Sequence, residues 1–484
     1  MRLLIVDHFF GQDIDALRHA AAEHELRVVS PDLLGDVARK MFPASVFSDS
    51  LGETYARPEY AEARRRYEAR ASSILESLYC AFPFDALIIP SDTIVYLRAC
   101  IPAAHQMGIP VIVLNKETTI SPHTLTAEAR VIGEFLPFIS DRLLVCSENN
   151  RRFWLNAGAD ARRLFVTGQP RFDLYRQPAR WKTLEWLGVN VQEGLPTLLF
   201  FSYDVGAYSP EGPSAPVWTQ LLTETEKVLV DLARAGHFNL LVKPHPQQQR
   251  IRETQERLSS LAGPAWGNLV QWLPGGLDTR QLIVNAQTVV GFQTTAMFEA
   301  MAAGKRVVYT FWTDAATRLG DAVVPFHEMG DALLVARSPR ELEAHLLSPP
   351  GSLLTEAQTR SRSLAVENQL GPIDGHASGR CIELIEECVA DHANRVGAPA
   401  LSLRRRLDLE APARCRRALS SAQLDSVSWR LVDWFWPVAS PTWLAVRWFL
   451  GKRGPALSRH SVIERRRAAE ERVGACRADL RRFA

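Results

Sequence analysis

Short apolar runs alternate with longer amphipathic stretches over the first part of the chain. The runs are rich in Leu, Ile and Val, as is usual for strands that are buried on both faces. The stretches between them, such as 13–23 and 58–80, have helical periodicity. This alternation predicts a parallel sheet with helices on both of its faces. The expected strands are Leu3–Val6, Leu26–Val29, Asp85–Pro90, Val111–Asn115, Arg142–Ser147 and Leu164–Thr167.

The same pattern returns after a Trp-containing connector at 177–194. Helices are expected at 218–235 and 375–392. The sequence therefore predicts an α/β protein in which two doubly wound, Rossmann-like domains face a cleft, the first spanning 1–185 and the second 190–395. The strands expected in the second domain are Thr197–Ser202, Leu240–Lys243, Asn268–Trp272, the apolar runs that begin at Val289 and Arg306, and Ala332–Ala336.

Residues 400–484 differ from the rest in composition. Residues 401–484 contain 18 Lys and Arg against 8 Asp and Glu, a net charge of +10, which leaves −8 for residues 1–400. Five of the twelve tryptophans lie within 429–450. Tryptophans flanked by arginines favour a membrane interface, so peripheral membrane contact through 429–482 is one interpretation. The other is that the aromatic residues pack on the protein body and the basic end is a solvated helix.

Cysteine usage and hydropathy indicate the compartment. The seven cysteines include no C-x-x-C pair, which argues against a disulfide framework or a zinc ribbon and for a reducing cytosol. No signal peptide is visible before the first strand, and no uncharged apolar run is long enough to cross a bilayer. A cytoplasmic protein, peripheral at the inner face of the membrane if the interfacial interpretation holds, is expected.

The segment 289–309 and the motif Lys243-Pro-His245-Pro carry the clearest chemistry. Val289 begins a buried strand that ends in a small polar loop, and a helix is expected to start near Thr295. Unpaired N–H groups at such a loop, together with the hydroxyls of Thr294 and Thr295, suit an anion. Lys243 and His245 lie at the C-terminal end of another strand of the same sheet, at the edge where open α/β sheets bind ligands. These features predict a pocket for a nucleotide mono- or diphosphate. The alternative for the His-Pro motif is a strand end with a surface histidine.

Several segments resemble bacterial surface-polysaccharide transferases of the GT-B fold, in particular capsule Kdo transferases and CDP-glycerol glycerophosphotransferases. Bacterial sialyltransferases share a similar His-Pro motif and Ser/Thr pair. The matching segments cover roughly residues 110–390. They are Thr167-Gly-Gln-Pro-Arg-Phe-Asp173, Lys243-Pro-His-Pro246, Gly291-Phe-Gln-Thr-Thr295 with Glu299, and Leu370-Gly-Pro-Ile-Asp-Gly-His-Ala-Ser-Gly-Arg380.

The resemblance implies inverting transfer from a nucleotide-activated donor without a catalytic metal or other cofactor, and no Asp-x-Asp motif stands in a strand-end loop. Lys243, His245, Thr294 and Thr295 would stabilise the departing phosphate, and His245 would protonate it. Glu299 would bind the ribose hydroxyls. Its alternative role is a carboxylate that interacts with a helix N-terminus.

Further residues complete the predicted site. Arg380 would contact phosphate, unless it merely belongs to a helix that Asp374 caps. Ser202 opens a loop toward donor or acceptor, whereas Arg171 is expected to pair with a carboxylate. The general base should follow a strand of the first domain, and the candidates are Glu117, Asp7, His8 and Asp92. Glu117 is favoured, although the glycerophosphotransferases have a histidine in that region.

These features favour a glycosyltransferase of surface-polysaccharide assembly that uses a CMP- or UDP-linked sugar. Its acceptor would be a glycan or a lipid-linked saccharide. The alternatives are a CDP-polyol phosphotransferase, a UDP-sugar 2-epimerase and a non-catalytic scaffold with the same fold. Nucleic acid is not expected as a partner, because the basic tail contains no recognisable recognition module.

Overall fold

The computed structural model describes residues 1–116, 120–203, 218–245, 248, 250–318, 323–348 and 355–396. Glu117 and the basic 400–484 extension lie outside the described residues. The chain divides into two compact units, and the described residues of the first are those of 1–67 and 84–396. Of the second unit, only 68–83 is described, as most of helix α5 (Ala61–Ala81). Both sheets belong to the first unit.

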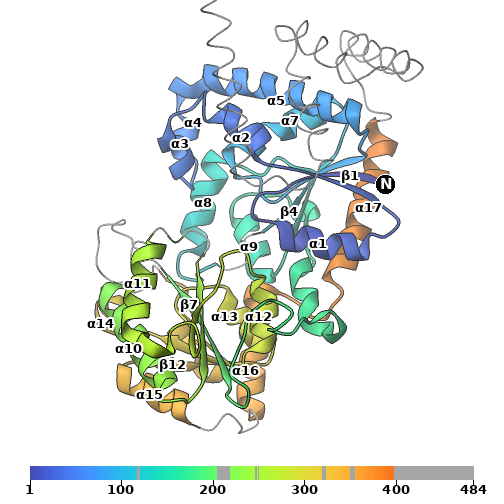
Figure 1. The fold of residues 1–484 in the computed structure, drawn as a ribbon. Coiled ribbons are helices and arrows are strands. Elements are labelled where there is room, and N and C mark those ends of the chain that lie inside the picture. Colours follow the sequence, from blue (N-terminus) through green and yellow to red (C-terminus); the bar gives the residue numbers. More distant parts are fainter. Residues whose placement is uncertain are drawn as a thin grey trace, which may run out of the picture. The chain divides into compact units, whose positions relative to one another are not determined.

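The first sheet has six parallel strands in the order β2-β1-β3-β4-β5-β6. Figure 1 labels β1 and β4 of this sheet. All four residues of β3 and of β4 are buried, which explains their uninterrupted apolar sequence. Each predicted strand of this half is confirmed to within two residues. The strands are β1 (Arg2–Val6), β2 (Glu25–Val29), β3 (Ala86–Ile89), β4 (Val111–Leu114), β5 (Arg142–Val145) and β6 (Leu164–Val166).

Helices connect these strands. The predicted helix at 13–23 is α1 and the one at 58–80 is α5, preceded by the 3-10 turn η1 (Pro58–Tyr60). The irregular stretch before α5 contains three short helices that the sequence pattern did not resolve. The other elements of this half are α1 (Gly11–Ala20), α2 (Asp32–Ala38), α3 (Ala44–Ser48), α4 (Glu53–Ala56), α6 (Val95–Arg98), α7 (Cys100–Gln106), α8 (Leu125–Phe135), α9 (Glu148–Asn156), η2 (Ala161–Arg163), η3 (Pro170–Arg176) and η4 (Pro178–Arg180).

The second sheet is also six-stranded and parallel, in the order β12-β11-β10-β7-β8-β9. Counted within this half, the order is 3-2-1-4-5-6 when read from β9, the order of the Rossmann fold. The first sheet follows 2-1-3-4-5-6, a flavodoxin-like order. Two doubly wound sheets confirm the predicted α/β class and the GT-B-like arrangement. The strands are β7 (Thr197–Ser202), β8 (Asn239–Pro244), β9 (Val270–Trp272), β10 (Thr288–Gly291), β11 (Arg306–Thr310) and β12 (Leu334–Ala336).

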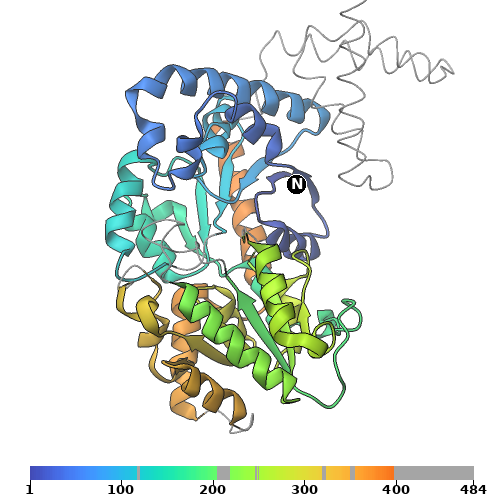
Figure 2. The same cartoon turned by 60° about the vertical axis from the view of Figure 1, so that its left-hand side comes forward.

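The last helix, α17 (Ala377–Val396), packs against the first half although it follows the second in sequence (Figures 1 and 2). Cys381, Ile385 and Cys388 are buried in one cluster with Leu3 and Ile88. The domain boundary expected at 395 follows chain order and groups this helix with the second half. The other elements of that half are α10 (Thr219–Arg234), α11 (Ile251–Ala262), η6 (Gly263–Ala265), α12 (Thr279–Asn285), α13 (Ala296–Ala302), α14 (Thr313–Arg318), η8 (Phe326–Glu328), η9 (Gly330–Ala332), α15 (Pro339–Leu347) and α16 (Glu356–Leu370).

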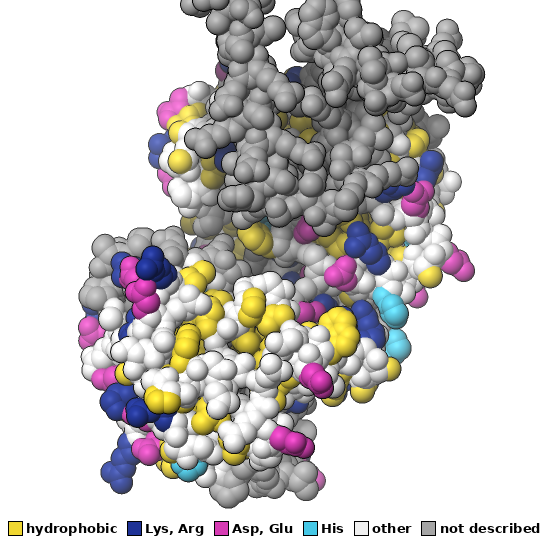
Figure 3. All heavy atoms as spheres, in the orientation of Figure 1, with side chains coloured by type: hydrophobic (Ala, Val, Ile, Leu, Met, Phe, Trp, Pro, Cys, Tyr) yellow, Lys and Arg dark blue, Asp and Glu magenta, His cyan; other side chains and the backbone are white. Residues whose placement is uncertain are grey.

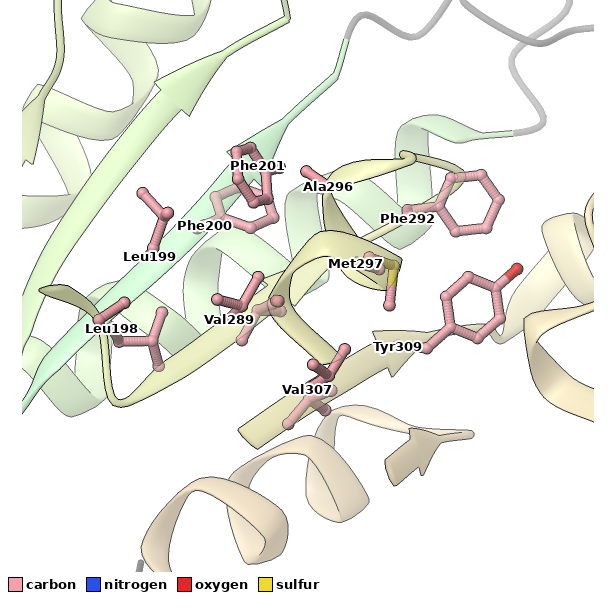
Figure 4. Packing of buried hydrophobic residues seen from close by; sticks show 14 of the residues in the cluster. Leu198, Leu199, Phe200, Phe201, Val289, Phe292, Ala296, Met297, Val307 and Tyr309 are labelled. Carbon is pink, nitrogen blue, oxygen red and sulfur yellow. The ribbon is translucent and has the colours of Figure 1, made fainter. Parts of the chain in front are cut away.

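The core of the second half is built on β7 (Figure 4). Leu198, Leu199 and Phe200 are almost fully buried, and Val289 of β10 and Val307 of β11 pack in the same cluster. This packing fixes the carboxyl ends of β7 and β10, from which the candidate site is built. Within the described part of the chain, none of the helices has the length and apolar character required to traverse a bilayer.

Candidate functional site

The candidate site lies at the carboxyl edge of the second sheet, where the strand order reverses between β7 and β10. Ligands of open α/β sheets bind at this switch point. The register places Val290 opposite Phe200, and Ser202 opposite Pro244. The segments that begin at Ser202, His245 and Gly291 therefore leave the sheet next to one another. Three sequence-distant candidates are brought to one edge by the parallel pairing.

The loop after β10 has a fixed and strained shape. Gln293 has φ 42°, which is unusual for a residue with a side chain. The side-chain Nε2 of Gln293 donates to Tyr309 Oη at 3.0 Å and to the Val324 carbonyl at 2.9 Å, and its side-chain Oε1 accepts from Val324 N at 2.9 Å. These three hydrogen bonds hold the backbone in the left-handed region. The loop is thereby preorganised rather than free to rearrange.

The threonine pair lies on this loop, at the start of α13. The Thr294 methyl group would come within 3.2 Å of a Cβ placed on Gly291, so the glycine lets Thr294 fold over the strand end. Thr294 Oγ1 accepts from Ala296 N at 3.3 Å. Thr294 and Thr295 are both only partly buried and lie at the carboxyl edge of the sheet, and their contact with a phosphate stays a prediction.

His245 directly follows β8 and is tied to β7. Its backbone N–H donates to the Ser202 carbonyl at 3.1 Å and to Gln248 Oε1 at 3.3 Å. Gln248 Nε2 in turn lies 3.5 Å from Ser202 Oγ. Burial lowers the pKa of His245, and the charge of Lys243 lowers it further. The imidazole is therefore neutral at pH 7, and an anion bound beside it would favour its protonated form.

Lys243 has a different environment from the one the motif indicated. Its side chain is buried, and its ammonium group donates to the Gly275 carbonyl at 2.7 Å and lies 3.5 Å from the Pro274 carbonyl. Burial lowers the pKa of Lys243, while Asp278 raises it. The cation thus lies under the loop that follows β9. In the described structure it holds that loop and contributes charge to His245.

Glu299 lies inside α13, and its carboxylate is buried. Tyr175 Oη donates to Glu299 Oε2 at 2.5 Å. Burial raises the pKa of Glu299, whereas Arg171, Tyr175 and Arg280 oppose that shift. The residue therefore belongs to a buried polar cluster, and its predicted contact with a ribose stays a prediction.

That cluster joins the two halves of the chain. Arg171 pairs with Asp13 of α1 at 3.1 Å, which confirms the expected carboxylate partner. Arg280 donates to the Arg171 carbonyl and pairs with Asp278 at 2.7 Å. Gln12 donates to Asp278 at 3.1 Å. Residues from α1, η3 and α12 thus form one network beside Glu299.

Arg380 stands at the start of α17, in a second junction. Its guanidinium pairs with Asp374 at 2.7 Å and donates to the Thr167 carbonyl at 2.8 Å. Asp374 Oδ1 accepts from His376 N, and Asp173 accepts from the N–H groups of Ala377 and Ser378. In the described structure Arg380 therefore holds a turn, and Asp173 caps the helix. Contact of Arg380 with phosphate stays a prediction.

The first sheet has its own switch point, between β1 and β3. Asp7 and His8 follow β1 there, as predicted from their position. Asp7 Oδ1 accepts from Phe10 N at 3.2 Å, and His8 Nδ1 lies 2.5 Å from Tyr96 Oη. Phe9, between His8 and Phe10, has φ 53° and is 71% exposed. The structure therefore places Asp7 and His8 at the carboxyl edge of the first sheet, and their part in catalysis stays a prediction.

Two other candidate bases have different outcomes. Asp92 is fully buried; one oxygen pairs with Arg98 at 2.9 Å and the other accepts from Ile139 N and Ser140 N. It therefore stabilises its loop and does not face a substrate. Glu117 lies outside the described residues. Its neighbour Lys116 donates its N–H to the Pro90 carbonyl at the end of β3.

Sequence reasoning missed part of this arrangement. Asp278, Arg280 and Tyr175 carry little signal of their own, apart from the N-cap pattern at Asp278, which accepts from Arg280 N at 2.9 Å. Across the described ranges, no three His, Cys, Asp or Glu residues are grouped as ligands for a metal ion.

No protein-family model matches the sequence, and no curated protein is significantly similar to it. Solved structures with a similar fold include UDP-GlcNAc 2-epimerase from Neisseria meningitidis bound to UDP-GlcNAc, at 13% identity and a TM-score of 0.47, covering 80% of this chain and 100% of that one. The UDP-GlcNAc 2-epimerase from Methanocaldococcus jannaschii in complex with UDP-GlcNAc and UDP is 13% identical, with a TM-score of 0.46. Anabaena HepE in complex with UDP is 12% identical, with a TM-score of 0.40. Each of these two similarities covers 80% of this chain and 100% of the other. These similarities are too low to assign a function.

Proposed function

We propose that this protein is an enzyme that acts on a nucleotide-activated sugar, with the nucleotide bound at the carboxyl edge of the second sheet. One observation carries the proposal: at the switch point between β7 and β10, parallel pairing brings together the segments that start at Ser202, His245 and Gly291. The fixed loop at Gln293 supports it, since strained, preorganised backbone concentrates at ligand sites.

The residues fit a phosphate. The hydroxyls of Thr294 and Thr295 can donate to phosphate oxygens, and His245 can donate once it is protonated. Lys243 adds positive charge near the bound phosphate without contacting it, since its ammonium group is held by the Gly275 carbonyl. In this proposal Glu299 takes the ribose hydroxyls. In a transfer reaction the nucleotide is released as a product, whereas in an epimerisation the product is again a nucleotide-sugar.

Two reactions fit this binding. The first is transfer of the sugar to an acceptor hydroxyl, with Glu117, Asp7 or His8 as the base and Asp7 and His8 already at the switch point of the first sheet. The second is 2-epimerisation of a UDP-sugar, the activity named for the Neisseria and Methanocaldococcus structures. Transfer needs an acceptor, whereas epimerisation proceeds with the nucleotide-sugar alone, so the products separate the two.

Nucleotide affinity is the direct test. We expect the full-length protein to bind UDP or CMP and the corresponding sugar nucleotide in isothermal titration calorimetry. Thr294→Val and Thr295→Val should each weaken binding about tenfold, because each removes one hydrogen bond to a charged group. Thr223→Val is the matched control, since Thr223 is partly buried on α10, as the two loop threonines are, and its hydroxyl donates only to carbonyls of its own helix among the described residues. Its affinity should equal that of the wild-type protein.

The same titrations contain the outcomes that would contradict the proposal. We expect nucleotide binding to take up protons, because a bound phosphate raises the pKa of His245. Proton uptake is measured as the dependence of the binding enthalpy on the ionisation enthalpy of the buffer. The His245→Gln variant should take up fewer protons. Failure to bind UDP, CMP or CDP would leave a non-catalytic scaffold with this fold. Release of CMP from a CDP-polyol would identify a polyol-phosphate transferase.

A further inference from the structure

A hollow of about 470 Å³ lies at the carboxyl ends of β11 and β12. These strands pair in parallel with Thr310 opposite Ala336, so the residues that follow them leave the sheet side by side. Phe311 N donates to the Ala336 carbonyl at 2.9 Å. The hollow therefore occupies the edge at which doubly wound sheets bind ligands. Its walls include Phe311, Trp312, Thr313, Asp314, His327 and Arg337.

Two polar atoms in the walls have no protein partner. Thr313 Oγ1 and His327 Nδ1 are enclosed and lack a hydrogen bond to any described residue. Enclosed polar atoms are nearly always paired in folded proteins, and each exception calls for an explanation. Neither atom has accessible surface in this structure, so a ligand with hydroxyl groups would satisfy them only once the Thr313 and His327 side chains turn toward the hollow.

The backbone of Thr313 is strained. Its φ is 61°, and a β-branched residue in this region is a genuine outlier. Neighbouring Trp312 is fixed by a 2.7 Å hydrogen bond from its indole N–H to Glu224. Such strain persists where surrounding structure imposes it and is concentrated at ligand sites.

Arg337 supplies a cation at the rim. Its backbone N–H donates to Glu341, and its guanidinium has no hydrogen bond or ion pair among the described residues. Burial lowers the pKa of His327 and the charge of Arg337 lowers it further, against an opposing effect of Glu328. The imidazole is therefore neutral at pH 7, and Arg337 is left as the cation.

The remaining surface is apolar and aromatic. The Phe311 ring stacks on His327 with centroids 4.5 Å apart and an interplanar angle of 21°. Trp312 and Ala316 line the same space. A mostly apolar hollow with a few convergent polar groups is the usual form of a small-molecule site.

We propose that this hollow binds a monosaccharide unit that carries one anionic group, a carboxylate or a phosphate. Arg337 pairs with the anion, and the C–H face of the sugar packs on the aromatic wall. The Thr313 and His327 side chains turn toward the hollow, so that Thr313 Oγ1 and His327 Nδ1 bond ring hydroxyls. The site uses none of the residues assigned to the nucleotide, and it stands whether or not the protein binds one.

The hollow is nevertheless linked to the Gly291–Thr295 loop. The ring of Phe292 in that loop stacks on the ring of Tyr309, with centroids 5.5 Å apart. Figure 4 shows these two side chains next to each other. Tyr309 stacks on Phe311 with ring centroids 5.4 Å apart, and Phe311 stacks on His327. The two sites therefore lie at opposite ends of one aromatic stack. This arrangement suits an enzyme that binds an acidic saccharide next to its activated sugar.

Ligand-observed NMR titrations of the full-length protein test the proposal. The probes are glucuronic acid, glucose 6-phosphate, glucose and inorganic phosphate. We expect one or both anionic sugars to bind about tenfold more tightly than glucose, as a charged hydrogen bond provides. Arg337→Gln should abolish that preference. Arg340→Gln, the same change at an exposed position on α15 outside the hollow, should retain it.

The threonine provides an independent check. Thr313→Val removes the hydroxyl at nearly constant volume and should lower the affinity for all three sugars severalfold. Thr313→Ser, which keeps the hydroxyl, should bind them like the wild type. A Thr294→Val and Thr295→Val double variant should bind the sugars like the wild type, which separates this site from the nucleotide site. The proposal is overturned if inorganic phosphate binds as tightly as the anionic sugars, or if Arg337→Gln retains their preference.

Discussion

Three residues with unusual backbone angles follow strands at the carboxyl edges of the two sheets. Phe9, Gln293 and Thr313 are the non-glycine residues with positive φ in the described ranges. Phe9 follows β1, Gln293 follows β10 and Thr313 follows β11. Each costs about 1 to 2 kcal/mol of backbone energy, so the surrounding contacts must enforce it. For Gln293 those contacts are visible as three side-chain hydrogen bonds.

His245 should make folding stability depend on pH. Its pKa is lowered by burial and by Lys243, so the folded state favours the neutral form. The stabilisation is complete above the unfolded pKa of about 6.5 and is lost as pH falls toward the lower folded pKa. We expect the difference in unfolding free energy between wild type and His245→Gln to decrease from pH 7.5 to pH 5.5. Urea denaturation at both pH values measures it, and an increase would contradict the assigned direction.

Between elements, Gly371 at the end of α16 makes a close backbone contact. A Cβ there would lie 1.7 Å from the carbonyl oxygen of Cys146, which follows β5 in the first half. The residue also has φ 75°. The glycine therefore allows the backbone of α16 to touch the first sheet, and the Leu370–Arg380 segment that the sequence singled out begins at this contact.

Replacing Gly371 with Ala should destabilise the protein by more than about 4 kcal/mol, because a backbone clash adds to the left-handed strain. Gly236→Ala is the control. Gly236 has φ 80°, but a Cβ added there would meet nothing within 4 Å, so the cost should be about 1 to 2 kcal/mol. Guanidinium denaturation compares the two. Equal losses would show that strain alone, and not the contact, explains the glycine.

The start of α17 illustrates a longer reach. Asp173, which precedes the helix by about 200 residues, accepts from its first N–H groups at 2.9 and 2.8 Å. A cap supplied from η3 cannot be recognised in local sequence, since N-cap patterns are read from adjacent residues. The sequence offered Asp374 instead, which bonds His376 N and Arg380.

For the whole molecule, charge is distributed unevenly along the chain. On the face in Figure 3, the Lys and Arg side chains of the described second half are interspersed with Asp and Glu. Residues 401–484 carry a net charge of +10 by sequence. Interfacial contact through 429–482 is therefore a proposal that rests on composition.

Deleting residues 401–484 should weaken binding to vesicles that contain anionic lipid, because each Lys or Arg near such a surface contributes about 1 kcal/mol. Cosedimentation with anionic and with zwitterionic vesicles measures the loss. Nucleotide affinity should be unchanged, as every residue predicted to contact the nucleotide lies outside the deleted segment. Equal vesicle binding with and without the deleted residues would contradict the interfacial role.

The sequence by itself determined the α/β class, the positions of the strands and the residues at their carboxyl ends. It could do so because buried parallel strands are continuous apolar runs, and because strand ends are read from local pattern. Ser202, His245, Thr294 and Asp7 were located in this way. The sequence did not determine which of the two domains α17 packs against, since the apolar face of this helix would suit either sheet.

Tertiary structure decided which of these residues meet and what each one bonds. Strand order places β7 beside β10, which local sequence cannot specify because it depends on crossovers through intervening helices. Burial turned Asp92 into a structural ion pair and placed Lys243 beneath Gly275. The hollow beside Arg337 exists only because β11 and β12 end together. Contacts between residues distant in sequence fix these features, whereas periodicity and composition record only each segment's own preference.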